Sequence, residues 1–405
     1  MPLKIIQISK YDSAGGGASK VAEELTDLLL NQGHQVVHYV RGAGQGFNAY
    51  RKPLYGIRTK KLMGWLARKG WVDVFPFEFI YLIFKPTFWR SDIIHFHDIS
   101  GAYSPLTVTL VSYLKKTIWT LHDLSMLTGG CLYPLDCRNF DKGCGSCPQI
   151  GNWPLETNVD RTDWLYRFRN WCIGKCRATL ISPSEWLKNL VKCRTTLHVD
   201  QISNGVNLLL FRFLDKKSVR KKLNLPLDKK IVLLSASDLG DRRKGTLFAI
   251  EALREVEESF HVLLMGKKSP EVETLLTNYD LSFSALGYVR DSSRLNECYA
   301  AADIFLFCSI ADNQPLSILE SLASGTPVVG FSSGGVAEMI QDNSNGYLVS
   351  PENHSELVSA LVYAFTEADL NQWSINAREI AERQYSDEYF LQSYIGYYCA
   401  LSNRH

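Results

Sequence analysis

Two acidic residues separated by seven others are the residues of this chain best suited to do chemistry. Asp312 follows an apolar run, 303–308, which is typical of a buried parallel strand. Glu320 lies inside the next predicted helix, 316–323, whose leucines fall on one face. Glu320 is too far from the start of that helix to cap it. We therefore expect Glu320 to accept hydrogen bonds from sugar hydroxyls, the alternative being an ordinary turn with a solvated glutamate.

The loop 312–314 lies where the strand ends and the helix begins. Backbone N–H groups at a helix N-terminus have no intrahelical acceptor, and the helix dipole adds positive potential there. Leu316 and Ser317 occupy this first turn. The sequence thus predicts an anion site, such as one for phosphate, next to Glu320.

A second anion-binding feature is the stretch 238–245, which follows the predicted strand 231–237. Lys244 comes directly before a glycine at a strand-to-helix junction, where its ammonium would serve a diphosphate as a point-charge partner. Arg243 precedes it and is a second candidate for the same diphosphate.

Near the N-terminus, a glycine-rich turn follows the predicted strand 4–9 and precedes a helix with one apolar face. Gly16 and Gly17 lie in this turn, where the backbone can approach a phosphate closely. The spacing is neither the dinucleotide fingerprint nor a P-loop, so the turn alone is a weak signal.

Histidines follow two further predicted strands, 92–97 and 117–123. The carboxyl ends of strands in an open α/β sheet face the ligand crevice, so His122 is expected to point into it. His95 and His97 form a weaker pair, for which packing or contact with the acceptor is the simpler interpretation. These strands fix no ligand geometry for a zinc ion.

Four cysteines lie within a short Gly- and Pro-rich stretch that ends in Cys-x-x-Cys. Thiolates at this density repel one another unless they are protonated, bridged or bound to metal. The leading interpretation is a structural zinc site, ahead of reduced cysteines in an ordered loop and of an iron–sulfur cluster. The predicted ligands are Cys131, Cys137, Cys144 and Cys147.

The segment 51–90 departs most from the average composition. It holds nine basic residues against two acidic ones, with aromatic residues such as Trp65 and Trp71 between them. This combination favours a surface that rests on an anionic membrane, although a solvated basic helix over an aromatic core fits as well. RNA binding would need support elsewhere in the chain, and we find none.

The remaining bulk properties narrow the class of protein. A length of 405 residues predicts two domains, and a net charge of +2 gives no general attraction to nucleic acid. No apolar run reaches eighteen residues, which argues against a signal peptide or a spanning helix. Ten cysteines without a secretory signal indicate a reducing compartment, so we expect a cytoplasmic protein, at the inner face of the membrane if its acceptor is lipid-linked.

The acidic pair, followed by a small-residue turn and a Pro-Val-Val strand, resembles the retaining nucleotide-sugar glycosyltransferases of family 4. That family usually has glutamate at the position of Asp312 and arginine at the position of Asp238. The resemblance extends over nearly the whole chain and includes an Asn-Gly-Val turn near residue 204. It implies the GT-B fold, in which two Rossmann-like α/β domains face each other across a cleft.

The resemblance also implies roles for single residues. Gly16 and Gly17 would contact the donor diphosphate or the acceptor. His122 would lie close to the transferred sugar together with Asp312, with Glu320 on the donor ribose. The remaining donor contacts would come from Arg243, Lys244, Leu316 and Ser317 around the diphosphate, and from Val289 and Arg294 around the nucleoside base.

We therefore expect domains at 1–199 and 200–385, with the last helix, 386–405, packed back on the first. The expected activity is retaining, hexosyltransferase-type transfer from a UDP- or GDP-linked sugar to a glycan or polyprenyl-linked acceptor in bacterial polysaccharide biosynthesis. No Asp-x-Asp motif occurs, so catalysis should need no metal cofactor, and zinc would be structural only. The alternatives are a GT-B-fold sugar-nucleotide 2-epimerase and a catalytically silent paralogue that binds nucleotide sugars.

Overall fold

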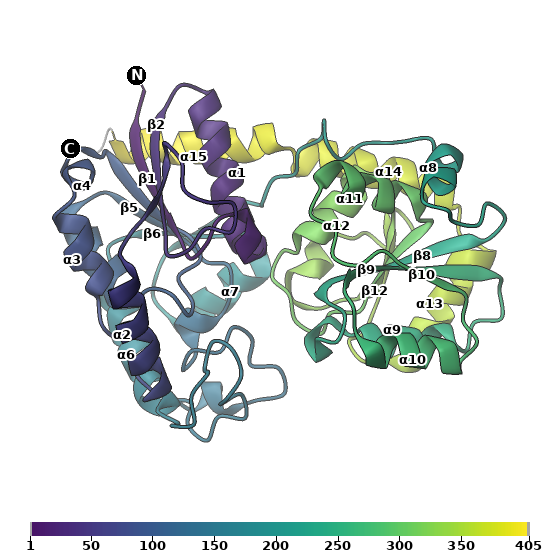
Figure 1. Cartoon of the computed structure of the whole chain (residues 1–405), viewed down its shortest axis with the longest axis horizontal. Helices are drawn as coiled ribbons and strands as arrows, with labels where there is room; N and C mark the ends of the chain where they lie inside the picture. The colour runs from purple at the N-terminus through teal and green to yellow at the C-terminus, as the bar shows by residue number, and fades with distance from the viewer. Residues whose placement is uncertain (1, 403–405) are drawn as a thin grey trace. The chain divides into compact units, whose positions relative to one another are not determined.

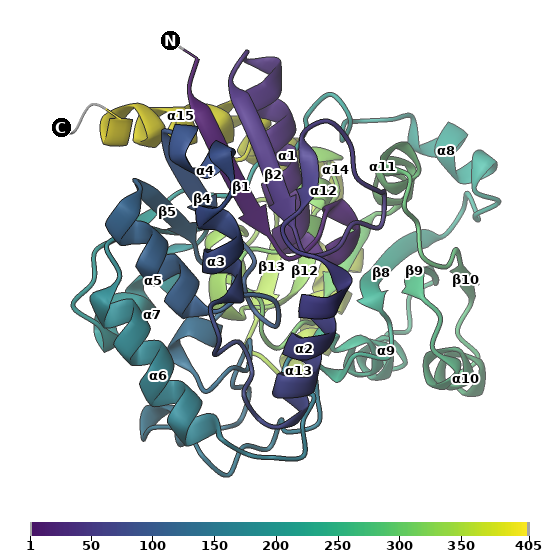
Figure 2. The same ribbon diagram turned by 60° about the vertical axis from the view of Figure 1, so that its left-hand side comes forward.

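The computed structural model describes residues 2–402, which form two compact units. Unit 1 comprises the chain up to Ile202 and again from Leu391, and unit 2 is Ser203–Phe390. Each unit is a parallel β-sheet covered by helices (Figures 1 and 2). The prediction of two Rossmann-like α/β domains is therefore confirmed.

Unit 1 is built on a seven-stranded sheet of order β3-β2-β1-β4-β5-β6-β7. Its neighbouring strands all pair in parallel. Because β1 lies between β2 and β4, the strand order reverses there, and the carboxyl ends of β1 and β4 mark a switch point where ligands bind in such folds. The strands are β1 (Lys4–Ser9), β2 (Gln35–Val40), β3 (Arg51–Pro53), β4 (Ile93–Phe96), β5 (Thr117–Thr120), β6 (Thr179–Ser182) and β7 (Val199–Gln201).

The helices of unit 1 form where apolar residues recur at helical spacing. In the first helix Val21, Leu25 and Leu29 are buried on one face, and the backbone leaves the helix at Gly33 with φ 82°. Helices α2, α3 and α4 follow one another along one side of unit 1 (Figure 1). The helices are α1 (Gly17–Asn31), α2 (Ile57–Arg68), α3 (Phe77–Ile83), α4 (Pro86–Arg90), α5 (Pro105–Leu114), α6 (Thr162–Lys175) and α7 (Glu185–Arg194).

Unit 2 is built on a six-stranded parallel sheet of order β10-β9-β8-β11-β12-β13. Its switch point lies between β8 and β11, on either side of which the strand order runs in opposite directions. The strands are β8 (Lys230–Asp238), β9 (Phe260–Lys267), β10 (Phe283–Ala285), β11 (Ile304–Phe307), β12 (Val328–Phe331) and β13 (Gly346–Val349). The helices are α8 (Lys216–Lys222), α9 (Thr246–Leu253), α10 (Pro270–Asn278), α11 (Ser292–Ala301), α12 (Leu316–Ala323), α13 (His354–Thr366) and α14 (Leu370–Gln384).

The sequence of strand β11 is apolar throughout because the strand is buried on both faces of the sheet. Successive side chains point to opposite faces of a sheet, and both faces of this sheet are covered. Phe305 and Phe307 accordingly lie in the core on one face, and Ile304 and Leu306 in the core on the other. All four side chains are buried, so β11 is a rigid support for the loop that follows it.

The last helix, α15 (Asp387–Ser402), begins in unit 2 and belongs to unit 1 from Leu391 onward (yellow in Figure 1). Its Tyr394 and Tyr398 are fully buried in unit 1. Within the described part of the chain, none of the helices combines the length and the apolar character that crossing a membrane requires.

Candidate functional site

The predicted donor residues of unit 2 come from the two loops at its switch point. After β8 the chain makes a short 3₁₀ turn, Arg242–Lys244, and continues through Gly245 into α9. Gly245 has φ 66°, and a Cβ atom there would lie 2.0 Å from the carbonyl oxygen of Cys308. Only glycine therefore lets this turn approach the end of β11, and the amide of Ile310 then donates to the Arg243 carbonyl at 2.9 Å.

This approach brings Lys244, Arg243 and Asp312 together. The Lys244 ammonium lies 2.8 Å from one Asp312 carboxylate oxygen, and the Arg243 guanidinium lies 3.3 Å from the other. Ser309 donates a further hydrogen bond of 2.7 Å to Asp312. Burial acts to raise the pKa of Asp312, but the charges of Lys244 and Arg243 outweigh it and hold that pKa below its ordinary value. The carboxylate is thus ionised and holds both cations at one position.

The N-terminus of α12 follows this cluster directly. Pro315 has an extended backbone and leads into the first turn, which contains Leu316 and Ser317. Its N–H groups have no acceptor within the helix, by the geometry of any helix start. Two positive features, the Lys244–Arg243 pair and the start of α12, therefore flank Asp312, an arrangement suited to a diphosphate.

Glu320 is the fifth residue of α12, about one turn from its start, and is only 7% exposed. Tyr299 of α11 donates its hydroxyl hydrogen to a Glu320 carboxylate oxygen at 3.1 Å. Burial and the neighbouring carboxylate raise the pKa of Tyr299 well above its ordinary value, so the tyrosine stays a donor. The contact between Tyr299 and Glu320 could not be predicted from the sequence, because a strand and a loop separate the two residues along the chain.

The nucleoside-side residues are placed differently from the cluster around Asp312. Gly287 turns the chain with φ 71° after β10, and Val289 packs against the unit 2 core. Arg294 lies in α11, where its guanidinium pairs with Glu297 at 3.0 Å. Arg294 is therefore engaged in a local ion pair rather than with the cluster formed by Lys244, Arg243 and Asp312.

In unit 1, the predicted glycine loop lies at the N-terminus of α1. Gly16 precedes the helix with φ 102°, a conformation that side chains other than glycine rarely adopt, and Gly17 is the first helical residue. A Cβ added at Gly16 would meet no atom within 4 Å, so the loop is open on that side. Asp12 fixes the loop from below by accepting hydrogen bonds from the amides of Ala14 and Gln45.

Arg51 is a correction to the predicted basic surface. Its side chain is 5% exposed and pairs with the buried carboxylates of Glu23 and Asp12. The reason is that Arg51 begins the edge strand β3, of whose three residues it alone is buried. Glu23 also accepts a hydrogen bond from the Ser13 amide, so this buried ion pair supports the loop and is not available to a membrane.

His122 follows β5 and lies at the end of a chain of buried polar groups. Its Nε2 atom is 3.3 Å from Nδ1 of His97, and Nε2 of His97 is 2.8 Å from the Gln7 amide oxygen. The Gln7 amide nitrogen donates to the Tyr398 hydroxyl at 3.1 Å, and that hydroxyl lies 2.7 Å from His95. Since an amide oxygen can only accept, His97 carries its proton on Nε2, and the Nε2 proton of His122 is then donated to His97.

Burial keeps these histidines neutral. It lowers the pKa of His122 to about 4 and lowers those of His95 and His97 well below the ordinary value. The sequence favoured packing for one of the pair, His95 and His97, and the structure connects both to His122 through hydrogen bonds. His122 is therefore a neutral imidazole in contact with His97.

The four cysteines line one small, apolar pocket, but the structure does not support the predicted zinc site. Across residues 2–402, no three or more His, Cys, Asp or Glu side chains are grouped so that they could hold a metal ion. Cys131 is buried in an apolar cluster with Leu155 and Leu165. Burial raises the pKa of Cys131 to about 12 and that of Cys144 to about 11, so both thiols are protonated. Cys137 and Cys147 are half-buried and also free, which fits reduced cysteines in an ordered loop.

Comparisons with known proteins place the chain in a class. A model described as Glycosyltransferase Family 4 matches residues 15–209, and one described as Glycosyl transferases group 1 matches residues 230–367. Together they cover most of both units. The chain is a glycosyltransferase with the GT-B fold, and it belongs to the family 4 and group 1 glycosyltransferases.

Individual relatives align over nearly the whole chain. The chain is 26% identical over 415 aligned positions to the putative colanic acid biosynthesis glycosyl transferase WcaC of Escherichia coli K12, covering 95% of this chain and 97% of that one. Among solved structures, Anabaena Alr3699/HepE in complex with UDP-glucose matches with a TM-score of 0.70 at 15% identity, over 98% of this chain and 100% of that one. WaaG, a glycosyltransferase involved in lipopolysaccharide biosynthesis, matches with a TM-score of 0.68 at 16% identity, over 96% and 98%. At these identities the solved structures establish the fold.

Proposed function

We propose that the chain transfers a sugar from a nucleotide diphosphate donor, with retention of configuration, and that unit 2 binds the donor. The observation that carries this proposal is the group formed by Lys244, Arg243 and Asp312 beside the start of α12. It lies at the switch point of the unit 2 sheet, where ligands of open α/β sheets bind. That a solved structure of the same fold is a complex with UDP-glucose supports this class of donor.

In this proposal the leaving diphosphate is stabilised without a metal ion. Negative charge develops on the diphosphate as the bond to the sugar breaks, and preorganised positive groups lower the energy of that transition state. Lys244 and Arg243 supply two full charges, and the N–H groups around Leu316 and Ser317 supply oriented dipoles. Glu320 accepts from the ribose hydroxyls, while Val289 and Arg294 lie on the side of the base.

Asp312 has two tasks in this scheme. Before the donor binds, it holds Lys244 and Arg243 in place. Once the bound diphosphate interacts with these two cations, Asp312 accepts a hydrogen bond from a hydroxyl of the transferred sugar. Unit 1 contributes contacts to the transferred sugar and to the acceptor, through Gly16, Gly17 and His122. Because the pKa of His122 is about 4, it would act as a neutral hydrogen-bonding partner at physiological pH, with no enzyme nucleophile required.

We further propose that the acceptor belongs to bacterial surface-polysaccharide synthesis, as a glycan or a polyprenyl-linked glycan. The names of WcaC and WaaG, which refer to colanic acid and lipopolysaccharide, support this class of acceptor. The helices α2–α4 expose Trp65, Phe84 and Trp89 together with basic residues, which favours contact with an anionic inner-membrane surface.

That membrane contact predicts salt-sensitive binding. Each Lys or Arg near an anionic surface contributes about 1 kcal/mol, screened over about 8–10 Å at physiological ionic strength. The double variant Lys60→Glu, Lys61→Glu should therefore release the protein from anionic vesicles in co-sedimentation while nucleotide binding is retained. Equal binding to neutral and anionic vesicles, or to neither, would contradict the membrane role.

The activity itself is tested with a panel of UDP- and GDP-linked sugars and a membrane extract as the acceptor source. Release of nucleoside diphosphate together with a mass increase of one sugar in the acceptor supports the transferase. An epimerised sugar would instead indicate a 2-epimerase, and donor binding without turnover a silent binding protein. Lys244→Ala should reduce the turnover number more than it weakens donor binding, because charge develops only in the transition state. The matched control is Arg242→Ala, since Arg242 is exposed in the same turn.

A further inference from the structure

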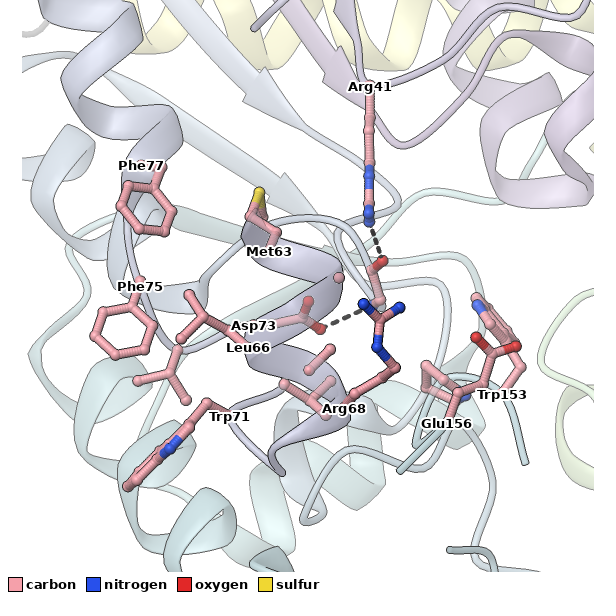
Figure 3. Close-up of a pocket in the computed structure, with 16 residues that line it drawn as sticks. Arg41, Met63, Leu66, Arg68, Trp71, Asp73, Phe75, Phe77, Trp153 and Glu156 are labelled. Carbon is pink, nitrogen blue, oxygen red and sulfur yellow. Dashed lines mark hydrogen bonds between the residues drawn. The ribbon is translucent and has the colours of Figure 1, made fainter. Parts of the chain in front are cut away.

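Unit 1 contains a cavity of about 290 Å³ that none of the roles above uses (Figure 3). Its walls come from the end of β2, from α2 and the segment that follows it, and from residues 153–156. Binding pockets for small molecules commonly measure about 300–1,000 Å³, so this cavity would enclose part of a ligand and leave the remainder outside.

The two sides of the cavity differ in chemistry. In Figure 3, Leu66, Trp71, Phe75 and Phe77 lie on one side, and they offer carbon surface. On the opposite side lie Arg41, Arg68 and Glu156, together with the indole ring of Trp153, and Asp73 lies between the two sides. Such a cavity fits a molecule with one polar and one aliphatic part better than a bare sugar, which needs hydrogen-bonding partners all around its ring.

The charge of the polar side is positive on balance. Asp73 accepts a hydrogen bond from the Gly101 amide at 2.8 Å and is compensated by Arg169, which lies 3.4 Å away. Arg41, by contrast, donates to the neutral carbonyl of Gly101 at 2.6 Å. The second acidic side chain of the lining is Glu156. With Asp73 compensated by Arg169, the positive charges of Arg41 and Arg68 therefore face the single negative charge of Glu156, and this excess favours an anionic group.

The apolar side continues onto the surface of unit 1. Helix α2 contributes Met63 and Leu66 to the cavity and exposes Leu62 and Trp65 to solvent next to them. Phe75 is itself 40% exposed at the edge of the cavity. A chain longer than the cavity could therefore leave it along apolar side chains, in the direction of the surface that α2–α4 present.

We propose that this cavity binds the lipid carrier of the acceptor, a phosphate or diphosphate joined to a long aliphatic chain. The phosphate lies against Arg41 and Arg68, and the first carbons of the chain lie against Leu66, Trp71 and Phe75. The assignment to the acceptor depends on the proposed transferase function, but binding of a lipid phosphate can be measured without it.

The test compares three probes by isothermal titration: dodecyl phosphate, inorganic pyrophosphate, and uncharged dodecyl maltoside below its micelle concentration. Dodecyl phosphate should bind at least about tenfold more tightly than either of the others, because only it satisfies both sides of the cavity. Arg68→Glu should weaken dodecyl phosphate about tenfold, since reversal of the charge replaces attraction by repulsion.

The matched control for Arg68→Glu is Lys69→Glu. Lys69 is the next residue, is also exposed and does not line the cavity. Equal effects of the two variants would mean that only the general surface charge is sensed, and equal affinity for dodecyl phosphate and pyrophosphate would mean a simple phosphate site. Either result, or no binding of dodecyl phosphate, overturns the inference.

The two proposals fail separately. Sugar transfer by a protein that does not bind dodecyl phosphate would support the transferase function and exclude the lipid site. Tight, Arg68-dependent binding of dodecyl phosphate without turnover of any donor would support the lipid site and exclude the transferase function. Leu66→Gln, which changes the apolar side alone, should weaken dodecyl phosphate and leave pyrophosphate unchanged.

Discussion

Replacement of Asp312 by asparagine would distinguish the two tasks proposed for this residue. Asparagine keeps the shape of the side chain but removes the negative charge that holds Lys244 and Arg243. If Asp312 restrains these cations before the donor binds, they become freer to bind a diphosphate in the variant. UDP should then bind more tightly to Asp312→Asn than to the wild type, while the turnover number falls because the contact to the sugar is weakened.

The structure sets the size of this effect. Two charges 4 Å apart interact by about 4 kcal/mol at the effective dielectric constant of a protein surface, and both contacts to Asp312 are shorter. The Lys244 and Arg243 side chains are 17% and 26% exposed, so water offsets much of this interaction. A net value of about 1.5–3 kcal/mol is typical of hydrogen bonds to charged groups. If half of this free energy, about 0.75–1.5 kcal/mol, becomes available for binding a diphosphate, UDP affinity rises about four- to twelvefold.

Titration calorimetry with UDP, at low and at high salt, measures this affinity. A loss of UDP affinity would refute the reasoning, since it would mean that Asp312 binds the nucleotide directly. The free energy of unfolding should fall by about 1–3 kcal/mol at neutral pH. Because the folded-state pKa of Asp312 lies below the ordinary 3.8, this stabilisation is present above that pH and is lost as the pH falls through the folded-state pKa. The variant and the wild type should therefore converge in acid.

Glu320→Gln should weaken donor binding about tenfold with the fold intact, because a charge-assisted hydrogen bond to the ribose becomes a neutral one; unchanged affinity for UDP would remove the ribose assignment. Cys131→Ser should cost about 1–3 kcal/mol by burying a hydroxyl, whereas Cys147→Ser, at a half-buried position, should cost less than about 1 kcal/mol in urea unfolding. Equal, large losses from both cysteine variants would restore the zinc hypothesis. Tyr398→Phe should lower the free energy of unfolding by about 1–3 kcal/mol, because it removes the hydroxyl that pairs with His95 and with the side-chain amide of Gln7. An unchanged unfolding midpoint would contradict this network. In the wild type, stability should fall as the pH drops from about 6.5 toward 4, since the buried histidines have depressed pKa values and the unfolded chain binds the extra protons.

The fold could be predicted from the sequence because local patterns carry it. The apolar run 303–308 and the apolar stripe of α12 can each be recognised from a few consecutive residues, and both elements are buried in the structure. The strand predicted at 4–9 has the same bounds in the structure. Boundaries between elements were less accurate where polar residues continue a strand, as at 117–123, of which β5 takes only Thr117–Thr120.

The site could be predicted only in part, because its central contacts join distant segments. Lys244 and Asp312 were each expected near the donor, but their ion pair spans 68 positions and depends on the close approach at Gly245. The same holds for Arg51, whose basic neighbours suggested a surface role and whose partners, Asp12 and Glu23, lie far away in the sequence. Composition cannot distinguish a buried arginine from an exposed one when the partner is not local.

The cysteine-rich loop shows a different limit. Cys-x-x-Cys spacing indicates that two thiols lie near each other, but it does not predict the direction in which the other two cysteine side chains point. Here Cys131 is buried in an apolar cluster with Leu155 and Leu165, and this burial is the main reason why its pKa is raised and its thiol stays protonated.

Helix α15 has a consequence for how the protein is made. Residues from Leu391 onward complete unit 1, whose other residues end at Ile202, so the whole of unit 2 is synthesised in between. Until Tyr394 and Tyr398 arrive, Thr120 and His95 lack the hydroxyl partners that they have in the finished protein. The half that leaves the ribosome first is therefore completed last, and a nascent or truncated chain that lacks α15 should be the form that chaperones and proteases recognise.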